Sequence, residues 1–148
     1  MTLSEELSRI SSIFIDTSSI IYYIEAHPQF GPLAKEVVRA FQSENLSAYS
    51  SVITLAEVLA KPTETGDERL ARKFAQFLKH GKNLAVIEIS ERIAEAAGRL
   101  RGRYPFLNTI DAIQLATALD VGAEAFVTND LKLQQFKESK VLILKDYL

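Results

Sequence analysis

The sequence of 148 residues contains no cysteine. This absence excludes a disulfide framework, a zinc–thiolate or iron–sulfur centre, and a thiol nucleophile. The sequence also lacks internal repeats, low-complexity tracts and any linker rich in glycine and serine. Because a chain of this length buries enough surface to build a core without disulfides or structural metal, we expect residues 1–148 to form a single domain.

Long apolar runs are also missing. No stretch approaches the roughly 20 uninterrupted apolar residues that a membrane-spanning helix needs. The first ten residues, MTLSEELSRI, carry two glutamates and lack the basic start and apolar run of a secretory signal. The sequence therefore predicts a cytoplasmic protein without a membrane partner.

The charge balance shows no excess of one sign. Lysine and arginine number 17 against 19 aspartate and glutamate, which gives a net charge of −2. This balance excludes a polycation that would coat nucleic acid unselectively, so any nucleic-acid contact must come from a local patch. Hydrophobic residues at 47% and charged residues at 24% are typical of a globular fold and not of disorder.

Short apolar runs alternate with segments of helical periodicity along the chain. The runs predict strands over residues 12–15, 46–50, 84–89, 125–128 and 141–144. Helical spacing predicts helices over residues 18–25, 33–41, 52–60, 67–80, 92–101 and 110–119, with loops at 26–32, 61–67 and 102–108. Strands that alternate with helices indicate an α/β fold with a parallel sheet covered on both faces.

Four acidic residues occupy positions where chemistry is expected. Asp16 and Asp130 follow predicted strands, at the sheet edge where parallel α/β proteins bind ligands. Glu57 and Asp111 interrupt otherwise apolar helical segments. Because an unpaired buried carboxylate is costly and neighbouring carboxylates repel one another, a divalent metal would stabilise a convergence of the four.

Each acidic residue also has an ordinary structural explanation. Asp16 and Asp130 are suited to cap the helices that follow them, and Asp111 lies three residues after Asn108, the spacing of a capping box. Glu57 precedes Lys61 by four residues, which suits an exposed ion pair on a helix. The sequence leaves these alternatives open.

Four segments in succession carry a family resemblance. They are FIDTSSIIYYIE at residues 14–25, SSVITLAEVLAKP at 50–62, NTIDAIQLATALDVGA at 108–123 and AFVTND at 125–130. In order and spacing they resemble the acidic motifs of the PIN domain family, whose single-domain bacterial members are VapC-type toxins. The resemblance implies a three-layer fold with a five-stranded parallel sheet in the order 3-2-1-4-5.

The same resemblance implies a function and a site. It implies an endoribonuclease that hydrolyses RNA phosphodiester bonds with Mg²⁺ or Mn²⁺, acting as the toxin of a type II toxin–antitoxin pair. A small antitoxin protein and a second copy of the chain are the implied protein partners. Carried over residue by residue, the catalytic and metal-binding acids are Asp16, Glu57, Asp111 and Asp130, with Ser18 and Thr128 in supporting positions.

Other functions fit the sequence less well. A phosphotransferase of the haloacid-dehalogenase type needs a second aspartate two positions after the first, where this chain has Ser18. A receiver domain needs paired acids after its first strand and a lysine after its last. A PIN-like module that binds RNA or protein without catalysis remains the alternative, although all four acids are present.

Two further features point to surfaces. Arg99, Arg101 and Arg103 form a basic cluster that we expect either to guide RNA toward Asp111 or to be a solvated helix face. Residues 20–24 are five consecutive apolar or aromatic side chains, which predicts either burial on two sides of a central helix or a protein interface.

Overall fold

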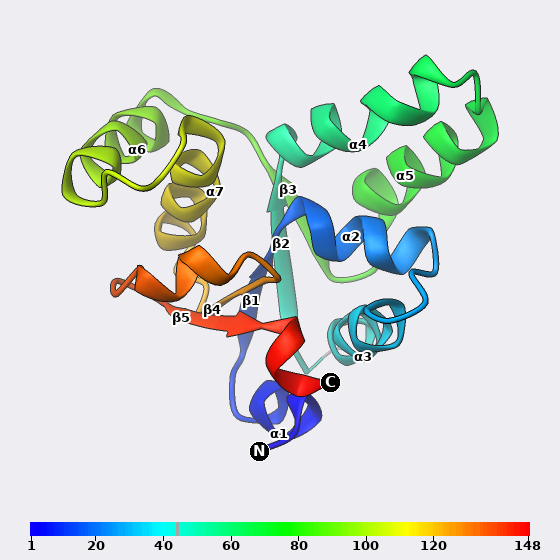
Figure 1. The fold of residues 1–148 in the computed structure, drawn as a ribbon, viewed down its shortest axis with the longest axis horizontal. Helices are drawn as coiled ribbons and strands as arrows, with labels where there is room; N and C mark the ends of the chain where they lie inside the picture. Colours follow the sequence, from blue (N-terminus) through cyan, green and yellow to red (C-terminus); the bar gives the residue numbers. More distant parts are fainter. Residues whose placement is uncertain (44) are drawn as a thin grey trace.

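A single parallel sheet organises the chain. The computed structural model describes residues 1–43 and 45–148, and its strands lie in the order β3-β2-β1-β4-β5 (Figure 1). The strands are β1 (Ser12–Ile15), β2 (Ser47–Ser51), β3 (Leu84–Ile87), β4 (Ala125–Thr128) and β5 (Lys140–Ile143). This arrangement confirms the predicted α/β class and strand order.

Helices connect the strands and cover both faces of the sheet. They are α1 (Leu3–Ser8), α2 (Thr17–Ile24), α3 (Gly31–Gln42), α4 (Val52–Glu64), α5 (Glu68–His80), α6 (Glu91–Arg103) and α7 (Thr109–Asp120). Two 3₁₀ helices, η1 (Leu131–Gln135) and η2 (Leu144–Tyr147), precede and follow β5. Figure 1 shows α6 and α7 on one side of the strands and α2 to α5 on the other.

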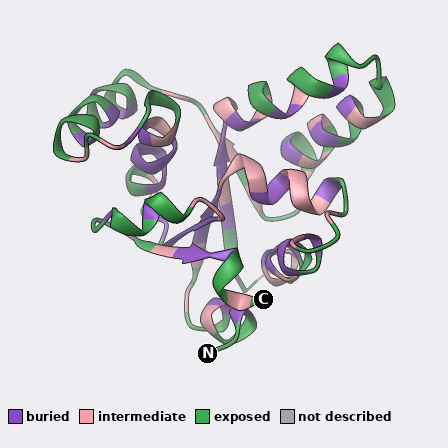
Figure 2. Cartoon of the chain, in the orientation of Figure 1, coloured by how far each residue is buried: buried purple, intermediate pink, exposed green. Residues whose placement is uncertain are grey.

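The alternation of strand side chains divides the core into two halves. Ile13, Ile15 and Val127 face the side of the sheet that α1 to α5 cover. Phe14 and Phe126 face α6, α7 and η1. The two phenylalanines are register partners on adjacent strands, and their rings stack with centroids 5.2 Å apart. The buried strands form the centre of a three-layer molecule with exposed outer helix faces (Figure 2).

The predicted boundaries differ from the observed ones at several places. The second strand begins and ends one residue later than predicted, the fifth begins and ends one residue earlier, and β3 ends at Ile87 instead of residue 89. The loop predicted over 61–67 is largely wrong, because α4 continues through Pro62 to Glu64. Pro62 lies in the last turn and is buried there, so its missing amide hydrogen interrupts only the end of the helix.

The N-terminal helix α1 was not predicted. Thr2 caps it by accepting a hydrogen bond from the Glu5 amide, and Leu3 and Leu7 bury one face.

Within the ranges that the structure describes, no helix combines the length and the apolar character that crossing a bilayer demands.

Candidate active site

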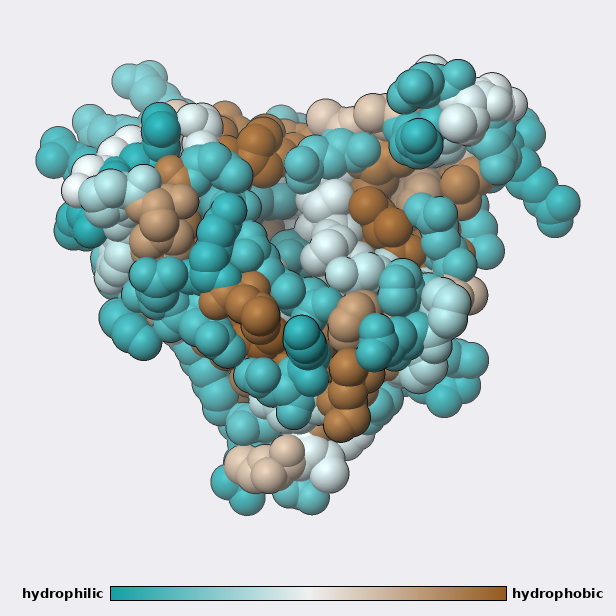
Figure 3. Space-filling model, viewed as in Figure 1, coloured by the Kyte–Doolittle hydropathy of each residue, from teal (hydrophilic) through white to brown (hydrophobic). Residues whose placement is uncertain are grey.

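A cavity of about 220 Å³ opens at the carboxyl ends of β1 and β4. Figure 3 shows this face hollowed between the α4–α5 pair and the α6–α7 pair. Every acidic residue singled out in the sequence lines this cavity. The lining comprises Asp16, Thr17, Ser18, Glu57, Ile110, Asp111, Gln114, Phe126, Asp130 and Leu133.

Asp16 lies where β1 ends and α2 begins. Its Oδ1 accepts hydrogen bonds from the Ser19 amide at 3.1 Å, the Ser19 hydroxyl at 2.9 Å and the Ser18 hydroxyl at 3.0 Å. Its Oδ2 accepts a hydrogen bond of 2.5 Å from the hydroxyl of Thr128, the last residue of β4. Asp16 is therefore the N-cap of α2, and its carboxylate is also fixed between two central strands.

Glu57 projects from α4 and is held through Thr17. The Thr17 hydroxyl donates a 2.5 Å hydrogen bond to Glu57 Oε1 and lies 3.0 Å from the hydroxyl of Thr54. Thr54 in turn accepts a 2.8 Å hydrogen bond from the buried amide of Gln114, whose oxygen accepts from the hydroxyl of Ser51. This hydrogen-bonded chain links α2, α4 and α7 behind the cavity, and through Thr17 it orients the exposed Glu57 side chain.

Asp111 and Asp130 share a lysine. The Lys132 ammonium lies 3.4 Å from Asp111 Oδ2 and 3.5 Å from Asp130 Oδ2. Asp130 caps η1 by accepting a hydrogen bond from the Lys132 amide, and Asn108 caps α7 by accepting one of 2.7 Å from the Asp111 amide. The capping interpretation is thus confirmed for Asp130. At α7 the cap is Asn108, whereas the Asp111 side chain faces Lys132, and both acids line the cavity.

The surroundings of two carboxyl groups oppose their ionisation. Burial raises the pKa of Asp16 above its ordinary value, and the hydrogen bonds from Thr128, Ser19 and Ser18 act in the opposite direction. Burial also raises the pKa of Asp111, against the attraction of Lys132 and with a further upward contribution from Asp130. The Lys132 pKa is raised mainly by the charge of Asp111 and then by that of Asp130. Burial is thus the main cause at both aspartates, whereas the raised pKa of Lys132 shows that Asp111 and Asp130 favour a positive charge beside them.

The donor atoms suit a hard divalent cation. Carboxylate and hydroxyl oxygens are the ligands that Mg²⁺ and Mn²⁺ prefer. One of them, Asp111 Oδ2, is buried and has no hydrogen-bond partner within residues 1–43 and 45–148. Across the same residues, no group of three acidic or histidine side chains is arranged to hold one ion. Asp16 is bonded to Thr128 and Glu57 to Thr17, and Asp111 lies beside Lys132.

The arginine cluster lies outside the cavity lining. Arg103 forms a two-pronged ion pair with Glu138, with both nitrogen–oxygen distances at 3.1 Å. The guanidinium of Arg101 bonds weakly to the Leu107 carbonyl at 3.5 Å, and Arg99 is exposed on α6. Their assignment to RNA contact remains a prediction.

Sequence reasoning missed several residues that hold the site, namely Thr17, Ser19, Ser51, Thr54, Gln114 and Lys132. Thr54 and Gln114 interrupt apolar helical segments, as Glu57 and Asp111 do, so the same signal identifies them. Lys132 carries no such signal, because its pairing with Asp111 depends on how η1 packs beside α7.

Replacing Asp111 by asparagine is expected to stabilise the metal-free protein. Because the folded-state pKa is raised, the folded protein holds this proton more tightly than the unfolded chain. The free energy of unfolding therefore decreases as the pH rises from the ordinary value of 3.8 through the folded-state pKa. Asparagine removes this penalty, and we expect a rise in Tm of roughly 2–5 °C at pH 7 in EDTA, which shrinks toward pH 3.5.

Asp120 provides a control for which the same substitution should change Tm in the opposite direction. Arg92 holds the pKa of Asp120 below its ordinary value, mainly through their hydrogen bonds. This pair stabilises the fold above the ordinary pKa and loses that effect as the pH falls, so Asp120→Asn should lower Tm slightly at pH 7. An Asp111→Asn protein that also melts lower at pH 7 would show that its ion pair with Lys132 outweighs burial.

Comparisons with known proteins identify the family of this fold. The model of the PIN domain family matches residues 13–139, a range that contains all four acids. No curated protein matches the sequence.

Solved structures share the fold. A toxin–antitoxin complex from Klebsiella pneumoniae is 27% identical with a TM-score of 0.68, over 90% of this chain and 98% of that one. DNA-bound VapBC from Salmonella typhimurium is 19% identical with a TM-score of 0.73, over 91% and 99%. VapC20 of Mycobacterium tuberculosis, a toxin that cleaves the sarcin–ricin loop, is 20% identical with a TM-score of 0.66, over 86% and 98%. With the family model matched across most of its length, the chain belongs to the PIN domain family.

Proposed function

We propose that this protein is a metal-dependent endoribonuclease and the toxin of a type II toxin–antitoxin pair. The observation that carries the proposal is the placement of Asp16, Glu57, Asp111 and Asp130 around one cavity at the carboxyl edge of the sheet. Membership of the PIN domain family and the likeness to toxin–antitoxin structures support it.

The four carboxylates would hold Mg²⁺ or Mn²⁺, and one of the oxygens that would bind the ion is Asp111 Oδ2, which is buried without a hydrogen bond and faces the Lys132 ammonium at 3.4 Å. A bound divalent cation activates water near neutral pH and offsets the charge that develops on a phosphate. The chain itself positions the ligands: Thr128 and Ser18 hold Asp16, and Thr17 holds Glu57. The cavity is smaller than the usual pocket for a whole small molecule, which suits a phosphodiester group whose flanking nucleotides stay outside.

Cleavage of RNA with and without divalent metal tests the proposal. Purified protein should cleave single-stranded RNA in Mg²⁺ or Mn²⁺, and EDTA should stop the reaction. A preparation that binds RNA with the same affinity in EDTA and in Mn²⁺, and leaves it intact in both, would instead identify a non-catalytic binding module. Among the described residues, no three acidic side chains are arranged to hold one ion, and this observation favours a non-catalytic module as the second candidate function.

Replacing Thr17 by valine is expected to lower the rate of RNA cleavage by about ten- to a hundredfold, as the loss of a residue that orients a ligand does. Valine keeps the shape of threonine but removes the hydroxyl that bonds Glu57 and contacts Thr54. Serine retains the hydroxyl, so Thr17→Ser should recover most of the activity. If Thr17→Val and Thr17→Ser cleave RNA equally, Thr17 does not position Glu57.

A small antitoxin is the proposed protein partner. The structural relative from Klebsiella pneumoniae is a toxin–antitoxin complex. On this chain, a groove of about 840 Å³ lies among α2, α3 and α5, and its apolar lining includes Tyr23, Ile24, Pro28 and Phe77. The run at residues 20–24 supplies two of these residues, whereas Ile20 is buried in the core. Apolar side chains gathered in an exposed groove are typical of a protein-binding surface.

Co-purification of this protein with the product of a neighbouring small reading frame tests the proposed partner. Replacing Phe77 by aspartate should abolish the co-purification. An exposed position on the same helix, such as Arg72→Asp, should leave the complex intact.

A further inference from the structure

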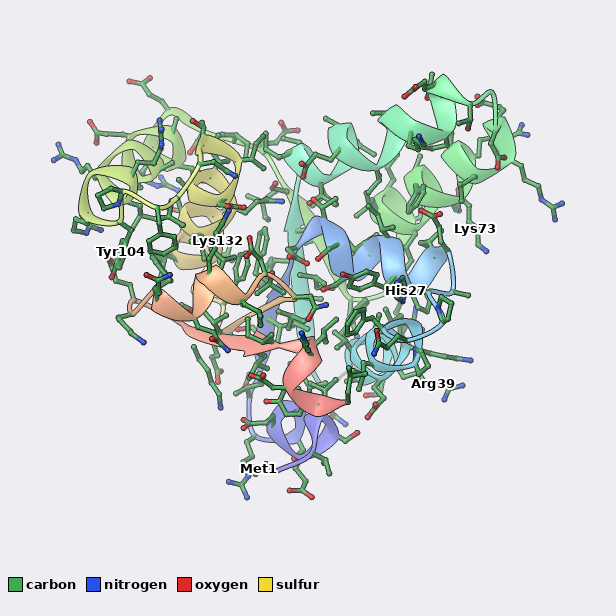
Figure 4. All side chains as sticks on the ribbon, viewed as in Figure 1. Met1, His27, Arg39, Lys73, Tyr104 and Lys132 are labelled. Carbon is green, nitrogen blue, oxygen red and sulfur yellow. The ribbon has the colours of Figure 1, made fainter. Side chains whose placement is uncertain are left out.

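Lys132 is a basic side chain that contacts two of the acids that line the cavity. It lies two residues after Asp130, on η1, and its ammonium faces both Asp111 and Asp130. Figure 4 labels Lys132 between η1 and α7, the two elements that carry these acids. The residues that line the cavity within the described ranges include no lysine or arginine of their own.

The contact of Lys132 with Asp111 and Asp130 consists of two long ion pairs. Both nitrogen–oxygen distances, 3.4 and 3.5 Å, exceed those of a charge-assisted hydrogen bond. The Lys132 and Asp130 side chains are 41% and 40% exposed, and an exposed pair of this kind is weak, whereas the Asp111 side chain is 21% exposed. Lys132 is therefore able to leave the two carboxylates without disturbing the core.

The charges explain why a lysine belongs at this position. Four carboxylates line the cavity, so a phosphate that approaches them meets the same sign of charge. Lys132 offsets part of this charge in the metal-free protein. A divalent cation held by these carboxylates would repel the Lys132 ammonium, which would leave Lys132 free to bind a phosphate.

We propose that Lys132 is an internal counter-ion of the cavity, which a divalent cation displaces from Asp111 and Asp130 and which then binds a phosphate of the RNA. This inference rests on the proposed metal-dependent function. It makes Lys132 a substrate-binding residue. It also predicts that removing the Lys132 charge raises the affinity for the metal and lowers the affinity for RNA.

Titration of Mn²⁺ measured by calorimetry tests the first part. Lys132→Met removes the competing charge and should raise the affinity for Mn²⁺ by about three- to tenfold over the wild type. Lys137→Met is the matched control, because Lys137 lies on the same surface segment and bonds the main-chain carbonyl of Gln134. The control should bind Mn²⁺ as the wild type does.

Binding of a fluorescent single-stranded RNA, measured by anisotropy in Ca²⁺ at several salt concentrations, tests the second part. Lys132→Met should weaken binding and reduce the salt slope of log K by about 0.7, the contribution of one phosphate contact on a single strand. Lys132→Arg keeps the charge and should keep the slope of the wild type. A purely structural role for Lys132 would instead weaken both Mn²⁺ and RNA binding.

Wild-type protein that binds Mn²⁺ while Lys132→Met binds it no more tightly would overturn the counter-ion role alone. A tighter Mn²⁺ site with an unchanged salt slope would overturn the phosphate contact. Wild-type protein that binds no Mn²⁺ would contradict the proposed function and this inference together.

Discussion

Replacing Asp16 by asparagine is expected to lower metal-dependent RNA cleavage by at least about a hundredfold, the loss that roughly 3 kcal/mol of charge stabilisation represents. Asp16 is the acid with the most hydrogen-bond donors around it, and both of its oxygens are oriented. Asparagine has no negative charge and turns an amide group toward Thr128 or Ser19. Single-turnover cleavage of RNA measures the loss of activity, and Mn²⁺ titration measures the loss of metal affinity.

Replacing Asp67 by asparagine is the control that distinguishes the chemical role of Asp16 from its role as a helix cap. It is the N-cap of α5 and accepts a 3.0 Å hydrogen bond from the Leu70 amide, so it matches Asp16 as a cap but does not line the cavity. Asn is as good an N-cap as Asp, so neither substitution should unfold the protein. Asp67→Asn should cleave RNA like the wild type. Full activity of Asp16→Asn, in preparations free of contaminating nuclease, would exclude Asp16 from the chemistry.

The largest effect on stability is expected from Phe126→Ala. The Phe126 side chain is 1% exposed, stacks on Phe14 with an angle of 6° between the rings, and borders the cavity. Removing the ring leaves a void between β1, β4 and α7, which costs about 3–5 kcal/mol. For a chain of this length the expected fall in Tm is roughly 10–15 °C.

Phe126→Leu is the graded comparison, because leucine refills much of the space and should cost under about 1.5 kcal/mol. Denaturant unfolding followed by circular dichroism measures both variants. If the alanine variant loses no more free energy of unfolding than the leucine variant, the two phenylalanine rings do not support the sheet as the structure indicates.

The order of strands and helices along the chain was predictable because apolar strand runs and periodic helical segments occupy separate stretches of the sequence. Runs such as SIFI and AFVT are short and apolar, and the helical segments between them are periodic, so the alternation alone indicates a parallel sheet. Exact boundaries were less predictable. At Pro62 the general rule against proline in helices predicts a break, but burial of its ring in the last turn of α4 overrides that rule.

The candidate acids were predictable from placement, and the family resemblance pointed to Ser18 and Thr128 as supporting residues, whereas the contacts that these and the other partners make were not predictable. Asp16 and Asp130 follow strands, which the sequence shows directly. That Thr128 bonds Asp16, and that Lys132 faces Asp111, depends on β4 lying beside β1 and on η1 lying beside α7. Tertiary packing decides such contacts, and a single sequence carries no record of it.

The central position of β1 has a consequence for synthesis on the ribosome. The first strand to emerge pairs on one side with β4, and the hydrogen bond from Thr128 to Asp16 closes a separation of 112 residues. At about 5–20 residues per second, translation of that stretch takes roughly 6–22 seconds. During this interval the nascent chain contains Asp16 without Thr128 or Asp130. The candidate site is therefore assembled only late in translation, after the residues that form β4 and η1 have been synthesised.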